Sequence, residues 1–264
     1  MPTAQVNRRS RQPELFTSVK LAADKDAAGR IRITLGLALT FGYIGGQELA
    51  RLRPRSATGI SFMKIYYSPT SPYVRKVLAT AHELGLADRI ERLPSAAHPV
   101  NRDRAIIAHN PLGQVPTLFT DDGVMLADSR VICEYLNDLA GGGLFPPPGP
   151  ARWRALVDQA IGDGILAAAL LSRYETVARP GDKLWQDWLN GQLDKVATSL
   201  TAIEAAAPSF GDRVDIGTIT FACALGYLDL RYPDLKWRDS HPATAAWFVR
   251  FDARPAMGST RHVA

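Results

Sequence analysis

One stretch rich in glycine and proline divides this chain of 264 residues into parts that follow different folding rules. Residues 141–150, GGGLFPPPGP, open with three glycines in a row and include four prolines. Such a stretch cannot continue a helix or a central strand, because proline lacks the backbone N–H that both structures use. Residues 63–140 carry strand-like patterns, and only helical patterns follow the stretch. We therefore expect two folded domains of different class, joined by a linker at 141–150.

The domain before the linker, residues 63–140, places short runs of β-forming residues around helical periods. The order of its expected elements is βαβ followed by ββα, with a tight hairpin at residues 121–123, DDG. This order predicts a four-stranded mixed sheet faced by helices, which is an α/β domain. The expected strands are residues 63–67, 89–93, 115–119 and 124–127, and the expected helices are 72–84, 102–108 and 128–140.

The domain after the linker, residues 151–264, has no strand-like pattern. Ala, Leu and Trp recur in it at helical spacing, which predicts an all-helical domain. The expected helices are residues 151–179, 183–206, 215–231 and 242–253.

Residues 1–62 carry the excess positive charge of the chain. They hold ten Lys and Arg against four Asp and Glu, whereas the remaining residues hold 21 against 22. The part of the chain with recognisable fold patterns therefore lacks the basic surface that a phosphate backbone requires, and we expect no nucleic-acid partner.

An apolar run, ITLGLALTFGYIGG, lies in this leading segment at residues 33–46. It is shorter than the roughly 20 residues of a membrane-spanning helix, and the basic cluster lies far upstream of it for a signal peptide. We interpret residues 1–62 as an extension that is disordered or not essential, with Met63 as the working start of the fold. A targeting or membrane-surface role and an integral place in the fold stay open; without a targeting role, no membrane partner is expected.

Cys133 and Cys223 are the two cysteines of the chain. They are too few and too far apart for a disulfide framework or a CxxC metal or redox motif. Both lie on apolar helix faces, so core packing is their simplest role. We expect no metal site and a reducing compartment, the cytoplasm.

Three hydroxyl residues, Ser68, Thr70 and Ser71, precede the first expected helix in the stretch SPTSPYVRKV. Ser71 followed by Pro72 is typical of a helix start, because the serine oxygen can accept from exposed N–H groups and a proline there wastes no donor. A helix N-terminus also carries roughly half a positive charge, which favours a thiolate over a thiol. A hydroxyl at this point can therefore cap the helix and can also donate to a sulfur anion.

Four motifs follow one another in order between residues 63 and 231, and the resemblance that they carry covers residues 63–264. They resemble a glutathione S-transferase, and the nearest similarity is to a bacterial group of that family. The resemblance implies a thioredoxin-like, α/β N-terminal domain that binds glutathione, an all-α helical C-terminal domain, and a homodimer; residues 1–62 fall outside it. The motifs are MKIYYSPTSPYVRKV from residue 63, NPLGQVPTL from 110, DDGVMLADSRVICEYL from 121, and DIGTITFACALGYLDLR from 215.

The activity that the resemblance implies is attack of the glutathione thiolate on a small, soft electrophile, with glutathione as co-substrate. Two alternatives stay open: a non-catalytic glutathione-binding or regulatory module of the same fold, and a glutathione-dependent thiol-disulfide exchange enzyme. The loop at residues 68–71 contains no cysteine, which argues against exchange through a nucleophilic thiol of the protein.

The resemblance also implies roles for individual residues. Ser71 is the first candidate for the sulfur ligand, and Thr70 and then Ser68 are the alternatives. Val115–Pro116 matches a cis-proline pair whose backbone binds the cysteinyl part of glutathione, and Gln114 matches a position that reaches the glycyl or cysteinyl part. Asp128 and Ser129 match an acid-serine pair that holds the γ-glutamyl group at a helix N-terminus.

Several polar residues have structural interpretations as well. Asp215 and Thr218, in DIGT, have the spacing of a reciprocal helix cap and are assigned to folding. Arg75, in the first turn of the first helix, either adds positive field or is a solvated surface residue. Residues 159–171 are small and apolar, with Asp163 as their only charge, and this segment either lines an electrophile pocket or packs as a core helix.

Overall fold

The structure, a computed structural model, describes residues 21–25, 31–35 and 62–262 of the chain. The chain divides into two units, residues 1–57 and 58–264. In the first, β1 (Leu21–Lys25) and β2 (Ile31–Leu35) pair as an antiparallel hairpin, which the sequence patterns did not predict. The basic clusters and most of the apolar run at 33–46 lie outside the described residues, so the interpretation of residues 1–62 as an extension stays a prediction.

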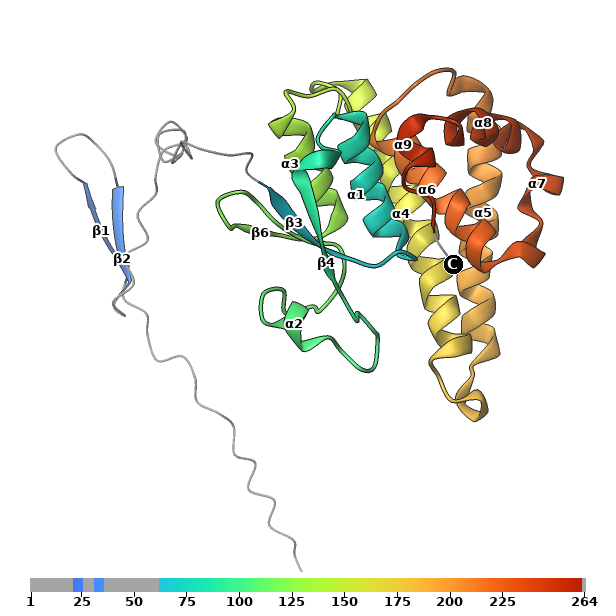
Figure 1. Cartoon of the computed structure of the whole chain (residues 1–264), viewed down its shortest axis with the longest axis horizontal. Coiled ribbons are helices and arrows are strands. Elements are labelled where there is room, and N and C mark those ends of the chain that lie inside the picture. Colours follow the sequence, from blue (N-terminus) through green and yellow to red (C-terminus); the bar gives the residue numbers. More distant parts are fainter. Residues whose placement is uncertain (1–20, 26–30, 36–61, 263–264) are drawn as a thin grey trace, which may run out of the picture. The chain divides into compact units, whose positions relative to one another are not determined.

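The second unit opens with a four-stranded mixed sheet, as the sequence predicted (Figure 1). Its spatial order is β4-β3-β5-β6; β3 and β4 are parallel, and the other neighbours are antiparallel. The strands differ from the expected ranges mainly at their ends: they are β3 (Met63–Tyr67), β4 (Ile90–Pro94), β5 (Thr117–Phe119) and β6 (Met125–Leu126).

Helices lie on both faces of this sheet. On one face, α1 (Pro72–Glu83) and α3 (Ser129–Leu139) pack over Met63 and Ile65, which are fully buried. Successive strand residues point to opposite faces, so Tyr66 points the other way, and its hydroxyl donates to the Ala105 carbonyl of α2 (Arg104–Ile107) at 3.3 Å. The α/β domain therefore has two helices between its sheet and the helical domain.

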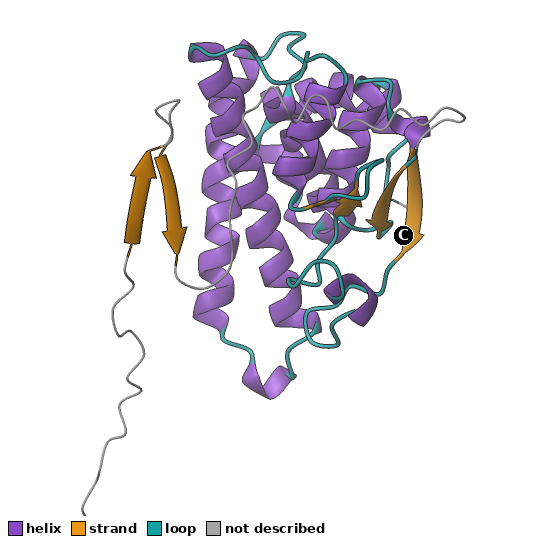
Figure 2. Ribbon diagram, turned by 90° about the vertical axis from the view of Figure 1, so that its left-hand side faces the viewer, coloured by secondary structure: helices purple, strands orange, loops and turns teal. Residues whose placement is uncertain are grey.

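The C-terminal part is all helical, as predicted. Its two longest helices, α4 and α5, lie side by side, and α6 packs against α4 (Figures 1 and 2). The sequence missed α7 and α9, because four residues are too few to show a helical period. The helices are α4 (Pro150–Val177), α5 (Gln186–Ala206), α6 (Ile216–Arg231), α7 (Trp237–Ser240), α8 (Pro242–Asp252) and α9 (Pro255–Gly258).

Glycines allow α4 and α6 to approach closely. A Cβ on Gly162 of α4 would lie 2.7 Å from Thr220 Cγ2, and one on Gly217 of α6 would lie 2.6 Å from Asp158 Cβ. Real carbon atoms do not approach to such distances, so a larger residue at either position would force the helices apart. The close approach buries Ile165, Leu166 and their neighbours in the core.

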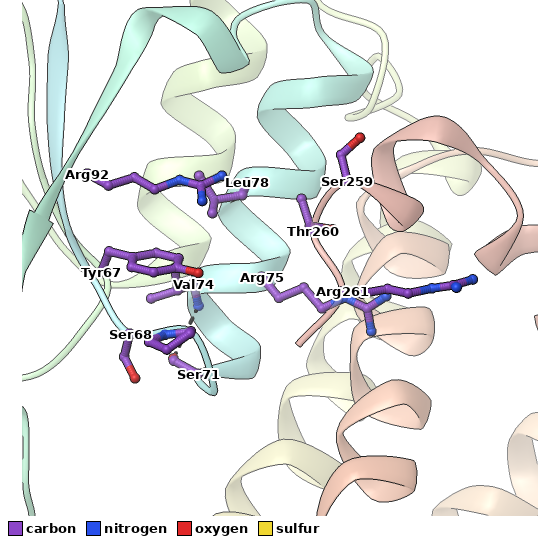
Figure 3. A pocket seen from close by; sticks show the side chains of 11 residues that line it. Tyr67, Ser68, Ser71, Val74, Arg75, Leu78, Arg92, Ser259, Thr260 and Arg261 are labelled. Carbon is purple, nitrogen blue, oxygen red and sulfur yellow. Dashed lines mark hydrogen bonds between the residues drawn. The ribbon is translucent and has the colours of Figure 1, made fainter. Parts of the chain in front are cut away.

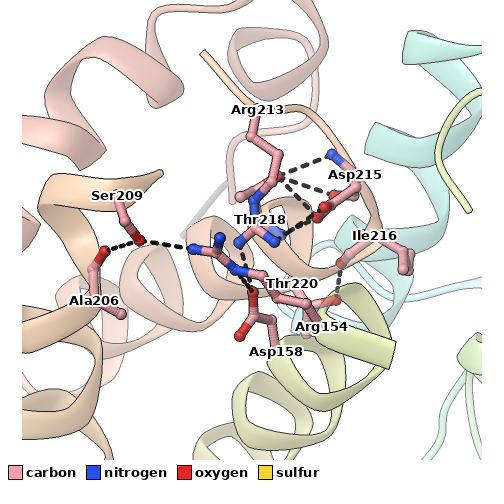
Figure 4. A network of polar contacts seen from close by, with 9 residues as sticks. All are labelled: Arg154, Asp158, Ala206, Ser209, Arg213, Asp215, Ile216, Thr218 and Thr220. Atoms are coloured by element: carbon pink, nitrogen blue, oxygen red, sulfur yellow. Dashed lines mark hydrogen bonds and ion pairs between the residues drawn. The ribbon is translucent and has the colours of Figure 1, made fainter. Parts of the chain in front are cut away.

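The start of α6 is fixed by a reciprocal cap, as the sequence predicted. Asp215 Oδ1 accepts from the Thr218 N–H at 3.0 Å, and Thr218 Oγ1 accepts from the Asp215 N–H at 3.0 Å (Figure 4). Arg213 pairs with Asp215 and also with Asp158 of α4. The cap therefore satisfies the buried end of α6 and ties it to α4.

Candidate functional site

Ser71 caps α1, as the sequence predicted. Its backbone is extended (φ −79°, ψ 119°), and its Oγ accepts from the Val74 N–H at 3.3 Å, with Pro72 as the first helical residue. A hydroxyl has one donor and two acceptor positions, so this bond leaves the Ser71 O–H able to donate. The residue can therefore cap α1 and donate to a sulfur anion at the same time.

The other two hydroxyl residues of this loop are placed differently. The Ser68 carbonyl accepts from the Ser71 N–H at 3.1 Å, which closes the turn before α1. Both Ser68 and Ser71 line a cavity at the loop, whereas Thr70 is not part of its lining. The geometry favours Ser71 as the donor, and the choice among the three hydroxyls stays a prediction.

The Val115–Pro116 peptide bond is cis, as predicted. Asn110 fixes the turn before it: this buried side chain donates to Thr117 Oγ1 at 2.8 Å and accepts from the Leu112 N–H at 3.0 Å. No hydrogen bond within the described part of the chain uses the backbone N–H or C=O of Val115. These two groups are therefore free to pair with an extended peptide, as in a neighbouring strand.

Gln114 lies between this bond and a sharp turn. Its side chain is exposed, and its carbonyl accepts from Thr117 Oγ1 at 2.7 Å. Gly113 has φ +61°, and a Cβ there would lie 2.9 Å from Ile107 Cγ1, so this turn requires glycine. The fixed turn leaves the Gln114 side chain available at the surface, and its contact with a ligand stays a prediction.

Asp128 and Ser129 start α3. Asp128 Oδ1 accepts from the Arg130 N–H at 2.9 Å, and Asp128 Oδ2 accepts from Arg130 Nη2 at 3.1 Å. Partial burial works to raise the pKa of the Asp128 carboxyl, but the hydrogen bonds from Arg130 outweigh it and hold this pKa below its usual range. An ionised carboxylate is thus held at the helix N-terminus, beside Ser129, which is buried.

Strand register brings the Ser71 loop, the Val115–Pro116 bond and the start of α3 to one edge of the sheet. Tyr66 of β3 pairs with Thr117 of antiparallel β5, so the loop after β3 and the residues before β5 lie at the same edge. Leu126 of β6 pairs with Leu118 of β5, which brings the start of α3 to that edge as well. Ser71, Val115 and Asp128 are therefore neighbours around one site, although 57 positions of sequence separate the first from the last.

A cluster of charges around the buried Lys76, which sequence reasoning missed, adjoins this edge. Lys76 of α1 is fully buried, and its Nζ lies 2.6 Å from Asp163 Oδ1 on α4. Arg130 Nε lies 3.9 Å from Asp163 Oδ2, and the Tyr73 hydroxyl donates to the Asp163 carbonyl at 3.5 Å. The cluster links the α3 N-terminus and α1 to the helical domain. Two sequence signals could have predicted the ion pair: Lys76 is a cation within an apolar helix face, and Asp163 is the only charge of an apolar segment.

The segment 159–171 lies within α4. Burial raises the pKa of Asp163 although Lys76 acts in the opposite direction. Ile165, Leu166, Ala168 and Ala169 lie in the core, and no residue of the segment lines the cavity at the loop. The inner residues of the segment therefore pack as a core helix, whereas Ala160, Gly164, Ala167 and Leu171 are exposed, and a role in an electrophile pocket stays a prediction.

The cavity at the loop has a volume of about 80 Å³ and lies between α1, β4 and the residues after α9 (Figure 3). Tyr67, Ser71, Arg75, Arg92, Thr260 and Arg261 are among the residues that line it. The interpretation of Arg75 as a solvated surface residue was wrong. This side chain is 4% exposed, because its Nη2 donates to Asp252 Oδ1 at 2.9 Å and to the Met257 carbonyl at 3.3 Å.

The two cysteines lie away from this site. Both are buried, as predicted, and neither is in a disulfide. Burial raises the pKa of the Cys133 thiol to about 11 and that of Cys223 to about 12. Neither thiol is therefore ionised near neutral pH. Among the described residues, no group of three or more His, Cys, Asp or Glu has the placement of a metal site.

Two family models match the chain. The glutathione S-transferase N-terminal domain matches residues 70–139, and the glutathione S-transferase C-terminal domain matches residues 186–250. The uncharacterized GST-like protein YibF of Escherichia coli (strain K12) is 35% identical over 185 residues, which cover 68% of this chain and 89% of that protein.

Solved structures agree with these matches. A glutathione transferase family member from Pseudomonas fluorescens Pf-5 with bound glutathione is 45% identical, has a TM-score of 0.75, and is matched over 76% of this chain and 100% of its own. A structure from the same organism with bound S-(propanoic acid)-glutathione is 43% identical, with a TM-score of 0.71 and the same coverage. The chain described here belongs to the glutathione S-transferase family.

Proposed function

We propose that this protein is a glutathione transferase that activates the thiolate of glutathione at Ser71 for attack on a soft electrophile. The observation that carries the proposal is the placement of the Ser71 hydroxyl. Its oxygen caps α1 with one lone pair, so its proton stays free to donate. It lies at the edge of the sheet that also holds the cis Val115–Pro116 bond and the N-terminus of α3. The Pseudomonas fluorescens relative with bound glutathione supports glutathione as the co-substrate.

In this proposal each element holds one part of glutathione. The backbone of Val115 pairs with the cysteinyl part, and Asp128 and Ser129 hold the γ-glutamyl part. The free thiol has a pKa of about 8.5, and the helix N-terminus and the Ser71 O–H lower it by stabilising the anion. The sulfur then attacks the electrophilic carbon, a C–S bond forms, and the leaving group departs with its electron pair.

Binding and turnover assays distinguish this function from its alternatives. We expect the protein to bind glutathione in a calorimeter and to catalyse its conjugation to 1-chloro-2,4-dinitrobenzene or another soft electrophile. Binding without turnover of any electrophile would instead support the non-catalytic module. Turnover of a small disulfide alone would support exchange, although the high thiol pKa values of Cys133 and Cys223 disfavour a protein nucleophile.

The two free cysteines also suit our proposal of a cytoplasmic location.

Replacing Asp128 by alanine is expected to weaken glutathione binding by about 1.5 kcal/mol, or roughly tenfold in Kd. The variant loses a charge-assisted bond to the γ-glutamyl ammonium. We expect the lower end of the range for such bonds, because the Asp128 side chain is 52% exposed. Calorimetric titration measures the change, and Asp121→Ala, which removes an acid at the DDG turn, serves as the control. An unchanged Kd would remove Asp128 from the site.

We also propose that the protein is a homodimer, and α4 supplies the surface. The residues of its outer face, Trp153, Val157, Ala160, Gly164, Ala167 and Leu171, recur every three or four positions and are all exposed. Trp153 is 65% exposed and Val157 is 56% exposed. Among the described helices, α4 alone has the length and apolar composition that could also cross a membrane. Its inner face packs on α6, so the unpartnered outer stripe suits a second copy of this fold.

Replacing Val157 by arginine is expected to convert the dimer to a monomer of 28.8 kDa. The change places two charges in the apolar contact, where burial without partners is costly. Light scattering after size-exclusion chromatography measures the mass. Val249→Arg is the matched control, because Val249 is a similarly exposed valine on α8, outside the stripe. A wild-type monomer, or a Val157→Arg dimer, would contradict the proposal.

A further inference from the structure

The cavity at the Ser71 loop has an unbalanced positive charge. Arg75 and Arg261 share one carboxylate, Asp252, at 2.9 and 2.8 Å. No carboxylate of the described residues forms an ion pair with the third arginine, Arg92. Among the described residues, these three guanidinium groups face one paired carboxylate, which leaves two positive charges in excess around the cavity. Such a site favours an anionic ligand.

Strand register places the Arg92 side chain on the face of the sheet that borders the cavity. Arg92 of β4 pairs with Ile65 of β3, so its side chain lies on the same face of the sheet as Ile65, the face that α1 covers. Its guanidinium carbon lies 4.9 Å from the centre of the Tyr67 ring, and the side chain extends over this ring toward α1 (Figure 3). The aromatic contact orients the guanidinium of this exposed side chain, and no hydrogen bond to another described residue uses its N–H donors.

Arg75 contributes a second positive charge. Its side chain is 4% exposed, and its Nε is fully buried without a hydrogen-bond partner among the described residues. Because the guanidinium is buried at the wall of the cavity, its charge is poorly screened by solvent and acts on an anion held there. The two arginines lie on elements that flank the cavity, whose lining also includes Ser71.

The size of the cavity limits the ligand. A cavity of about 80 Å³ holds on the order of half a dozen water-sized groups. That is room for a carboxylate with a short aliphatic chain.

We propose that this cavity holds the carboxylate of the second substrate, which is a short-chain acid with a soft electrophilic carbon. The inference rests on the proposed transferase function. With Arg92 on the carboxylate and the glutathione sulfur at Ser71, the electrophilic carbon lies between them. For a haloacetate, the sulfur attacks the methylene carbon, a C–S bond forms, the carbon–halogen bond breaks, and halide leaves with its electron pair. The thiol proton passes to solvent.

Binding of two isosteric thioethers tests the proposal without turnover. S-(carboxymethyl)glutathione carries the acid, and S-(carbamoylmethyl)glutathione carries a neutral amide of the same shape. We expect the wild-type protein to bind the acid about tenfold more tightly than the amide, as one charge-assisted contact provides. Arg92→Ala should abolish this preference and leave glutathione affinity unchanged, whereas Arg92→Lys should retain part of it. Arg250→Ala, at an exposed arginine of α8, is the control and should keep the full preference.

The corresponding electrophiles, iodoacetate and iodoacetamide, give the kinetic test. The ratio of their kcat/KM values, each corrected for the uncatalysed rate, should fall about tenfold in Arg92→Ala. Alkylation of the protein does not interfere, because Cys133 and Cys223 are its only thiols and are buried with raised pKa values.

The outcomes separate this inference from the proposed function. Failure of glutathione itself to bind would overturn the transferase proposal. Glutathione binding with no preference for the acid, or with a preference that Arg92→Ala retains, would overturn the anionic-substrate proposal and leave the transferase proposal intact.

Discussion

Replacing Ser71 by alanine is expected to lower turnover with any accepted electrophile by about 10- to 1000-fold, the upper part being typical for loss of one preorganised donor to an anion. The hydroxyl matters mainly to the ionised sulfur, whereas Val115, Asp128 and Ser129 provide most contacts to the rest of glutathione. Glutathione affinity should therefore change much less than turnover. Steady-state kinetics and calorimetric titration of the same preparation measure the two effects.

The pH profile gives an independent readout of the same variant. If Ser71 stabilises the thiolate, the apparent pKa of bound glutathione should rise in Ser71→Ala toward the solution value of about 8.5. Activity at low pH should then fall more than activity at high pH. The thiolate absorbs in the ultraviolet, so a spectroscopic titration of the binary complex reports this pKa without a second substrate.

Ser71 also caps α1, so the activity of Ser71→Ala must be separated from the effect of the substitution on protein stability. Loss of the bond from the Val74 N–H should lower the free energy of unfolding by about 1 kcal/mol. Activity is therefore compared well below the melting temperature, with Thr70→Ala as the matched variant in the same loop. The sulfur contact would be assigned to Thr70 if Ser71→Ala kept full activity and an unshifted pH profile while Thr70→Ala lost activity. If neither change matters, the hydroxyl mechanism is wrong.

The features that the sequence predicted best are those set by neighbours in the chain. The Ser71–Pro72 helix start and the cap between Asp215 and Thr218 each depend on residues within one helical turn. The mixed sheet followed from the order of short strands and helices, whose alternation restricts the possible topologies. The cis Val115–Pro116 bond is different, because only the family resemblance pointed to it.

The features that the sequence did not predict depend on contacts between distant segments. Arg75 has the local pattern of a surface residue, yet it is buried because α8 and the end of α9 supply its partners. Helical spacing alone does not distinguish a cation that faces solvent from one that faces an acid on another domain. The arginine-lined cavity was missed for the same reason, since β4, α1 and residues 259–261 meet only in the folded chain.

Replacing Lys76 by methionine is expected to lower the free energy of unfolding by about 3 kcal/mol. This value is at the low end for breaking a buried ion pair, because Asp163 keeps 13% side-chain exposure and Arg130 stays 3.9 Å away. Methionine fills a similar volume, so the loss comes from the unpaired Asp163 carboxylate and not from a cavity. Urea denaturation at pH 7 measures the change.

The dependence of this loss on pH identifies its cause. Burial already raises the pKa of Asp163 in the folded protein, and Lys76 opposes that rise; the variant removes the opposition, so the pKa rises further. A carboxyl with a raised folded-state pKa loses stability as pH increases from its unfolded value of about 4 through its folded value. The deficit of Lys76→Met should therefore be small near pH 4 and largest above neutrality, and Lys76→Met/Asp163→Leu should remove most of it. A deficit equal at pH 4 and pH 8, or one that the double variant retains, would mean that Lys76 stabilises the domain interface by packing and not by its charge.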